Sequence, residues 1–386
     1  MDQYQGWLVY EIDDLMSDGT VLDESKRPFL EAKYGKDLSG LGIPKFNRGR
    51  VAFEGRKTQE NIRELLNLAD FVTVTTDYLK NVYHDLYDVP LENIVAIPNL
   101  LPRYLFGDRY DPARKAKDFG KHKDRPRVGI VSSLSHYNAE GYRVDRKGLT
   151  CRKSSRPDGT TFWANEAKEE VPESETSELV DDIDAIAGCI RETVDDFQWV
   201  FLGFCPPKLA DLAKAGKIEV HRGTTIMDYP SAFHRLNLHA CVAAINPVPF
   251  NMCKSFIKTM ECAALGVACF ATDALPYSRV MPKERLFRTG GDLKRMLLDL
   301  KLRSPDRYRD ILEEQWKWLN SPCEEGDFHL ASFWLEDNLR IFTDLYRLRP
   351  KGYEVPLGNF SVQYAARKKL ERENTIFKND NILITR

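Results

Sequence analysis

The sequence predicts an α/β protein built on parallel sheets, and two observations support this class. Short apolar runs alternate with amphipathic segments along most of the 386 residues, which is the pattern of strands that alternate with helices. Hydrophobic residues make up 42% of the chain and charged residues 30%, a balance that is typical of globular proteins and excludes a disordered or fibrous chain. A chain of this length has room for two domains.

The first domain is predicted over residues 1–107. An apolar run at 7–12 ends in Asp13 and Asp14, so two carboxylates lie at the carboxyl end of the first strand. The alternation then continues as helix 57–68, strand 71–75, helix 77–87 and strand 94–97.

The second domain is predicted over residues 108–345, where a polar and basic stretch at 108–127 marks the boundary. Its strands are expected at 128–131, 199–203, 218–220, 238–244 and 268–271. Its helices are expected at 180–194, 207–214, 228–236, 254–265 and 291–300, followed by the aromatic-rich helices 306–319 and 328–347 and a tail at 346–386. This order is that of a doubly wound parallel sheet.

Residues 139–178 interrupt the alternation and are interpreted as an inserted hairpin or lid. Six basic residues lie in the first half of this segment, between 142 and 156, and the second half is rich in glutamate. Two interpretations remain open for the basic run. It is either a solvated charged loop, or an arm that follows a phosphodiester backbone with Trp163 as a stacking platform.

Composition excludes several other classes. The net charge is −2, so charge alone gives no sign of nucleic-acid binding. The chain has no apolar run long enough to span a membrane, and Met1–Gln5 lacks the basic flank of a signal peptide, so a cytoplasmic protein is expected. The eight cysteines include no Cys-x-x-Cys pair, which predicts reduced core thiols and no structural zinc.

The segment 246–261 is the most informative part of the chain. A proline-punctuated loop leaves a strand, and a helix is expected to begin near Lys254, so its first backbone N–H groups and its dipole favour a phosphate or diphosphate. Lys258 would add positive charge, and Glu261 lies one turn later, where a carboxylate accepts hydrogen bonds from sugar hydroxyls. The alternative is an ordinary surface helix that carries a Lys/Glu ladder.

Residues 238–279 resemble the donor-binding segment of family 4-type (group 1) glycosyltransferases. The matching residues are Pro249-Phe250-Asn251, Lys254-Ser255, Lys258, Glu261, Ala264-Leu265-Gly266-Val267 and Tyr277. Glu261 matches the second of two family glutamates, which typically holds the ribose, whereas the first falls on Cys253. Weaker matches lie at 69–76, 97–99, 128–136 and 199–203.

The resemblance implies a GT-B fold, with two Rossmann-like domains and here a shortened N-terminal domain, in which the chain end crosses back to the first domain. It also implies sugar transfer from a nucleotide-sugar such as a UDP- or GDP-sugar, with retention and without a metal or cofactor. The implied catalytic residues are Asp14, His136 and Lys258. The implied donor-binding residues are Ser133, Gly203, Asn251, Lys254, Ser255, Lys258 and Glu261. Simpler interpretations are a helix N-cap for Asp14 and a packed loop histidine for His136.

The acceptor stays open at this stage. The Tyr10–Asp14 strand resembles that of bacteriophage glycosyltransferases, which favours hydroxymethylated phage DNA as the acceptor, and surface polysaccharide is the competing class. A different possibility is a non-catalytic nucleotide-sugar-binding subunit whose short first domain is completed by a partner chain.

Overall fold

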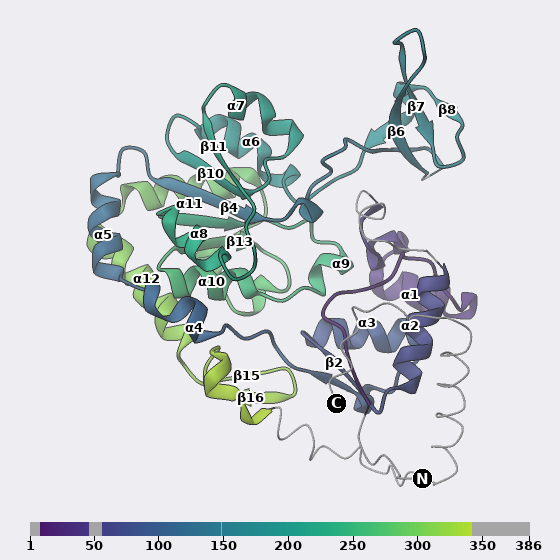
Figure 1. The fold of residues 1–386 in the computed structure, drawn as a ribbon, viewed down its shortest axis with the longest axis horizontal. Helices are drawn as coiled ribbons and strands as arrows, with labels where there is room; N and C mark the ends of the chain where they lie inside the picture. The colour runs from purple at the N-terminus through teal and green to yellow at the C-terminus, as the bar shows by residue number, and fades with distance from the viewer. Residues whose placement is uncertain (1–7, 46–55, 148, 342–386) are drawn as a thin grey trace.

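A computed structural model describes residues 8–45, 56–147 and 149–341 of the chain. Two separate parallel sheets with helices packed around them form two lobes, and a third, smaller sheet projects from the larger lobe (Figure 1). The two parallel sheets confirm the predicted α/β class.

The first domain contains a short sheet in the order β1-β2-β3, all parallel. Its strands are β1 (Val9–Glu11), β2 (Phe71–Val74) and β3 (Ile94–Ala96), and its helices are α1 (Arg27–Tyr34), α2 (Arg56–Leu68) and α3 (Asp77–Tyr87). The apolar stripes of α2 and α3 cover this sheet, since Leu66, Val82 and Tyr83 pack with Val72 in one core. The predicted strands and helices of this domain lie where the sequence placed them, while α1 was not predicted.

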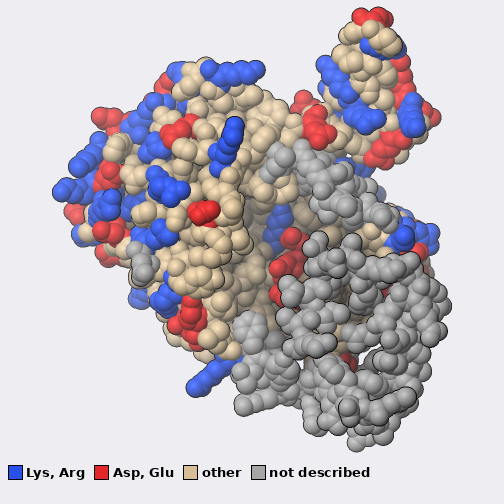
Figure 2. Space-filling model, in the orientation of Figure 1, with Lys and Arg blue, Asp and Glu red and all other residues tan. Residues whose placement is uncertain are grey.

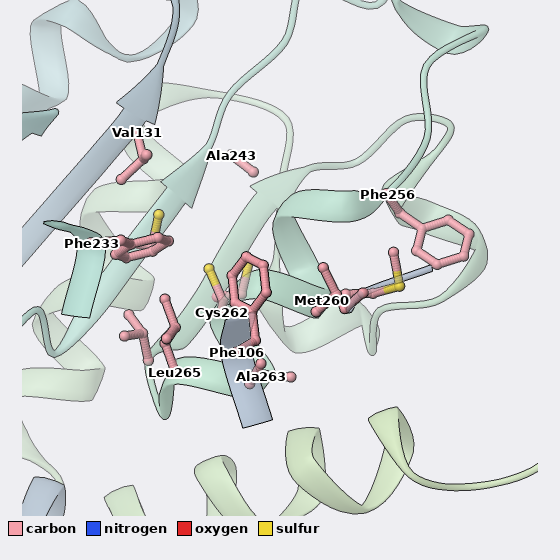
Figure 3. Packing of buried hydrophobic residues seen from close by; sticks show 14 of the residues in the cluster. Phe106, Val131, Phe233, Ala243, Phe256, Met260, Cys262, Ala263 and Leu265 are labelled. Atoms are coloured by element: carbon pink, nitrogen blue, oxygen red, sulfur yellow. The ribbon is translucent and has the colours of Figure 1, made fainter. Parts of the chain in front are cut away.

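The second domain is a parallel sheet in the order β11-β10-β4-β12-β13-β14. Its strands are β4 (Arg127–Ser132), β10 (Gln198–Gly203), β11 (Ile218–Arg222), β12 (Ala240–Ala243), β13 (Ala268–Thr272) and β14 (Leu286–Phe287). Its helices include α6 (Asp184–Thr193), α7 (Ala210–Lys214), α8 (Tyr229–Arg235), α9 (Pro249–Met252), α10 (Ile257–Leu265), α11 (Gly290–Leu302) and α12 (Pro305–Leu319). Cores lie on both faces of this sheet, and Figure 3 shows the one in which α10 packs against Phe106 and Phe233.

The stretch 108–127, predicted as a polar boundary, contains a helix instead. After α4 (Arg103–Phe106), α5 (Pro112–Lys121) packs on α12, where Phe119 stacks on Tyr308 with ring centroids 4.4 Å apart. Lys115 is buried and donates to Asn237 Oδ1 at 3.1 Å. The sequence did not predict this helix, because only one face of the lysine-rich segment carries the few apolar residues that pack.

The prediction of a helix at 328–347 is wrong within the described residues, because no α-helix forms there. The chain instead forms the hairpin of β15 (Cys323–Glu325) and β16 (Phe328–Leu330), then an extended segment and a 3-10 helix at Leu335–Asn338. Phe333 and Trp334 are buried as extended chain, because Leu101 pairs with Trp334 in a β-bridge. Phe342, Leu345 and the tail 346–386 lie outside the described residues.

The hairpin of β15 and β16 docks on the first domain. Asp327 accepts a hydrogen bond from Ala96 N at 2.7 Å and forms an ion pair with Lys80 at 3.0 Å. Gly326 has a φ of +57°, and a Cβ there would lie 2.4 Å from Ala96 O, so only glycine permits this close approach. A continuous helix from 328 would lose this turn and its contacts.

The insertion is a five-stranded antiparallel sheet in the order β8-β7-β6-β5-β9, which is more than the predicted hairpin. Its strands are β5 (Arg143–Asp145), β6 (Thr150–Ser155), β7 (Thr161–Asn165), β8 (Glu170–Val171) and β9 (Thr176–Glu178). We call residues 143–178 the arm, because they project away from the larger lobe (Figure 1). Among the described residues, no helix is both long enough and apolar enough to cross a bilayer.

Candidate active site

The candidate site lies where the second sheet changes direction. From β4 the chain continues through the arm and α6 to β10 and β11 on one side, whereas β12, β13 and β14 lie on the other side of β4. Open α/β sheets bind ligands in the crevice at such a point, outside the carboxyl ends of the strands. Figure 2 shows basic and acidic side chains together in the recess between the two lobes.

His136 follows β4 and is held by Asp182, which lies just before α6. Its Nδ1 is 2.7 Å from Asp182 Oδ2. Burial lowers the pKa of His136, and the positive charges of Lys254 and Lys258 lower it further, against the opposing effect of Asp182. The lowered pKa leaves His136 neutral near pH 7.

Asp182 also binds the loop that follows β12. Its Oδ1 accepts a hydrogen bond from Asn246 N at 2.8 Å and another from Asn251 Nδ2 at 2.7 Å. Asn251, which the resemblance implies as a donor-binding residue, is buried, and its amide also donates to Asn246 O at 2.8 Å. In this structure the amide of Asn251 thus shapes the loop.

Lys254 is a half-buried cation at the same place. Among the described residues its side chain has no hydrogen bond or ion pair, and its Nζ lies 5.1 Å from the centre of the Phe250 ring. Burial lowers the pKa of Lys254, and the negative charges of Asp182 and Asp14 oppose that effect. A desolvated cation without a partner is available to an anionic ligand.

Lys258 and Glu261 form a closed cluster with Tyr229 of α8. The Lys258 Nζ lies 3.0 Å from Glu261 Oε2 and 2.9 Å from Tyr229 Oη, and Tyr229 donates to the same Glu261 oxygen at 2.7 Å. Burial alone would lower the pKa of Lys258, but the Glu261 carboxylate outweighs it and raises that pKa. Lys258 therefore stays protonated and is already neutralised in part.

The N-terminus of α10 adjoins these lysines. The helix was predicted from 254 and begins at Ile257, with no capping side chain at Phe256 and no acidic residue in its first turn. Its first N–H groups are consequently available to an anion. Ser255 lies just before it and accepts a hydrogen bond from Asn99 Nδ2 at 2.9 Å, which ties this end to the chain that leaves the first domain.

Gly203 and Ser133 lie at the ends of β10 and β4. Gly203 has a φ of +109°, and a Cβ there would lie 2.3 Å from Ser132 O, so the close approach of the two strand ends requires glycine. Ser133 is exposed, and its hydroxyl is 2.5 Å from that of Ser135.

Asp14 comes from the first domain. No helix begins there, so the N-cap interpretation does not hold. Its carbonyl accepts a hydrogen bond from Tyr83 Oη at 2.8 Å, and its side chain is exposed. The charge of Asp14 acts on Cys253 and Lys254 across the seam between the domains, so Asp14 lies close to the candidate site.

Cys253, which the family resemblance aligns with the first family glutamate, packs into the core of the first domain. It is 1% exposed, and its carbonyl accepts a hydrogen bond from Thr76 Oγ1 at 3.0 Å. Burial raises the pKa of the Cys253 thiol. Cys253 therefore joins the two domains, and its side chain does not reach a ligand in the recess.

One group of possible metal ligands occurs among the described residues, away from this site. Asp118, His122 and His239 place ligand atoms within 4.8 Å of one another. His239 Nδ1 accepts a hydrogen bond from Arg127 N at 2.9 Å, and its Nε2 lies 2.9 Å from Asp118 Oδ2. Since Nδ1 is an acceptor, Nε2 carries the proton and offers no lone pair to a metal.

Sequence reasoning missed Asp182, Tyr229 and Asn246. Asp182 is one of two aspartates between the arm and α6, and the sequence placed it inside the helix predicted over 180–194. Tyr229 starts a helix far from Lys258 in sequence. Only the return of both helices to one end of the sheet brings these side chains to the site.

No protein-family model and no curated protein matches the sequence. Among solved structures, the chain is similar to a glycosyltransferase from Rickettsia africae at 12% identity and a TM-score of 0.41, over 76% of this chain and 66% of that one. It is similar to HepE from Anabaena in complex with UDP at 10% identity and a TM-score of 0.46, over 88% and 72% of the two chains. It is similar to an O-GlcNAc transferase from Thermobaculum terrenum at 12% identity and a TM-score of 0.38, over 73% and 45%. The chain thus spans about two thirds of the length of the Rickettsia protein, and likenesses at these values assign no activity to it.

Proposed function

We propose that this protein is a glycosyltransferase that moves a sugar from a nucleotide-sugar to an acceptor hydroxyl. The main support for the proposal is the environment of Lys254. This lysine is half-buried and unpaired among the described residues, and it lies beside the uncapped start of α10 where the second sheet changes direction. A cation and free helix N–H groups at such a crevice suit a diphosphate.

The chemistry that follows is mainly electrostatic. When the sugar leaves, negative charge grows on the nucleoside diphosphate, and Lys254 with the first N–H groups of α10 stabilises it. Lys258 adds a cation whose raised pKa keeps it protonated. Because Tyr229 and Glu261 hold Lys258 in place, its position does not depend on the ligand.

We extend the proposal to a retaining hexosyl or pentosyl transfer from a UDP- or GDP-sugar, as the family resemblance implies. Helix N–H groups and lysines supply the positive charge for the diphosphate, so the reaction is proposed to need no metal. Asp14, on the opposite side of the seam, is proposed to orient the acceptor hydroxyl.

The arm bears on the choice of acceptor. Four of its basic residues form ion pairs with its own glutamates: Arg143 with Glu173, Arg146 with Glu175, Lys147 with Glu169 and Arg156 with Glu170. The arm thus offers little net charge to a phosphodiester backbone. This pairing favours a glycan acceptor over hydroxymethylated DNA.

A non-catalytic nucleotide-sugar-binding subunit is the second candidate, and Cys253 favours it. A buried thiol at that position cannot contact the transferred sugar as a glutamate would. In this candidate a partner chain would extend the three-stranded sheet of the first domain.

One assay separates the two candidates. The full chain is incubated with a panel of UDP-, GDP- and ADP-sugars, and release of free sugar is followed with and without glycan and hydroxymethylated DNA acceptors. An enzyme releases or transfers sugar from one donor, and Lys254→Met abolishes the release. Binding of a nucleotide-sugar without any release supports the subunit instead.

A further inference from the structure

We propose that Asp182 is a positioning residue that fixes His136 as an acceptor for a hydroxyl of the donor sugar and, through Asn251, sets the place of Lys254. The inference rests on the proposed function for the identity of the ligand. In this proposal His136 contacts the sugar, whereas Lys254 and the start of α10 contact the diphosphate.

The first step is the tautomer of His136. An ionised carboxylate only accepts hydrogen bonds, and Asp182 already receives two at Oδ1. Its Oδ2 therefore accepts the proton of His136 Nδ1, which lies 2.7 Å away. The free ring nitrogen is then Nε2, which carries a lone pair in the neutral ring.

The second step is the ligand group that such a nitrogen recognises. A lone pair accepts a hydrogen bond from a hydroxyl and repels the oxygens of a diphosphate, which are acceptors themselves. Protonation would reverse this preference, but burial and the two neighbouring lysines keep the ring neutral. His136 therefore suits a sugar hydroxyl.

The third step connects Asp182 to Lys254. Asp182 holds the amide of Asn251, and Lys254 N donates to Asn251 O at 3.1 Å. One carboxylate thus ties together the loop after β4, the loop after β12 and the segment that leaves the arm. Each of its two oxygens serves a different part of the candidate site.

Asp182→Asn separates these two tasks. If the new amide oxygen keeps the Asn246 and Asn251 donors, its NH2 group faces His136 and donates to Nδ1. The ring must then carry its proton on Nε2, so the lone pair that is proposed to accept the sugar hydroxyl is lost. Asp182→Ala removes both tasks, and Asp196→Asn is a matched control, because Asp196 forms an ion pair with Lys301 and contacts no residue of the candidate site within the described part of the chain.

Two measurements test the proposal. Nitrogen-15 NMR of the histidine rings near neutral pH reports the tautomer of His136, which is assigned with His136→Gln. The expected result is a protonated Nδ1 in the parent chain and a protonated Nε2 in Asp182→Asn. A protonated Nε2 in the parent chain overturns the proposal, even if every Asp182 variant fails to fold.

The second measurement is calorimetry with two ligand pairs. One pair is UDP and a UDP-sugar, and the other is GDP and a GDP-sugar. For Asp182→Asn we expect no loss of affinity for the diphosphate and about 3- to 10-fold weaker binding of the nucleotide-sugar, the loss of one hydrogen bond. Asp182→Ala should weaken both ligands, and Asp196→Asn neither. Equal losses for both ligands in Asp182→Asn overturn the sugar contact. If the parent chain binds none of these four ligands, the proposed function fails. The tautomer of His136 measured by NMR then still tests the role of Asp182.

Discussion

The hydroxyl of Thr76 joins the two domains, because it donates to the carbonyl of Cys253 at 3.0 Å while it accepts from Leu79 N at 3.1 Å. The same side chain therefore caps α3 and holds the loop that leads to Lys254. The start of a first-domain helix and the candidate donor site are thus fixed to each other by one group.

Thr76→Val keeps the shape of this side chain and removes both hydrogen bonds. Loss of the N-cap and of the bond across the seam is expected to lower the free energy of unfolding by about 1–2 kcal/mol. Urea denaturation measures it. Thr161→Val, at the exposed first residue of strand β7, should change stability by less than about 0.5 kcal/mol, and equal effects of both variants would contradict the role of Thr76.

The cluster of Lys258, Glu261 and Tyr229 gives a second prediction. Glu261→Gln removes the charge that raises the pKa of Lys258 and leaves burial as the dominant effect, so that pKa should fall. The lost pair should cost about 1–3 kcal/mol of stability, and Tyr229→Phe should cost less. Denaturation midpoints check this, with the exposed Glu284→Gln as the control. A stability of Glu261→Gln equal to that of the control would show that the cluster contributes nothing.

The lowered pKa of His239 leads us to expect a smaller free energy of unfolding in acid. Burial lowers its pKa to about 4, so between pH 6.5 and that value the unfolded chain binds a proton that the folded chain does not. Stability should therefore decline as pH falls through this window, by about 3 kcal/mol at the lower end.

His239→Gln keeps one acceptor and one donor and should flatten the decline in denaturation curves recorded from neutral to acidic pH. His329→Gln, at an exposed position, should leave the slope unchanged. A parent-like slope in His239→Gln would assign the acid sensitivity to other groups.

The arm is expected to be separable from the core. Leu179 N lies 3.4 Å from Tyr142 O, so a two-glycine link between these residues can replace residues 143–178. Phe162 and Trp163 contact Arg156 and Arg143 of the arm itself, and the melting temperature of the shortened chain should stay within a few degrees of the parent. A large drop would show that the arm supports the main core, whereas a loss of acceptor use alone fits an acceptor-binding arm.

The sequence predicts the parallel sheets well because each buried strand carries its own apolar run. It fails where burial depends on a distant partner. Lys115 and Phe119 lie in a basic stretch that folds as a helix only against Tyr308. Phe333 and Trp334 have helical spacing, yet pairing with Leu101 holds them in extended chain.

The candidate site follows the same rule. Lys254, Lys258 and Glu261 lie within eight residues, so one helix start predicts them together. Asp182 and Tyr229 reach that helix only through the topology of the sheet, which no local pattern encodes. Such polar partners are hydrogen-bonded in the folded chain and look like ordinary surface residues in the sequence.

Calorimetric titration of the full chain with UDP and GDP tests the central claim, that Lys254 and the start of α10 hold a nucleoside diphosphate. One of the two nucleotides should bind at one site per chain. Lys254→Met should weaken that binding at least about 10-fold, the loss of a charge-assisted contact, without lowering thermal stability, since the lysine is half-buried and unpaired among the described residues. Lys283→Met, at an exposed residue of the 3-10 helix Lys283–Arg285, should bind as the parent does. Binding by Lys254→Met as tight as that of the parent chain, or no binding of either nucleotide by the parent, would contradict the claim.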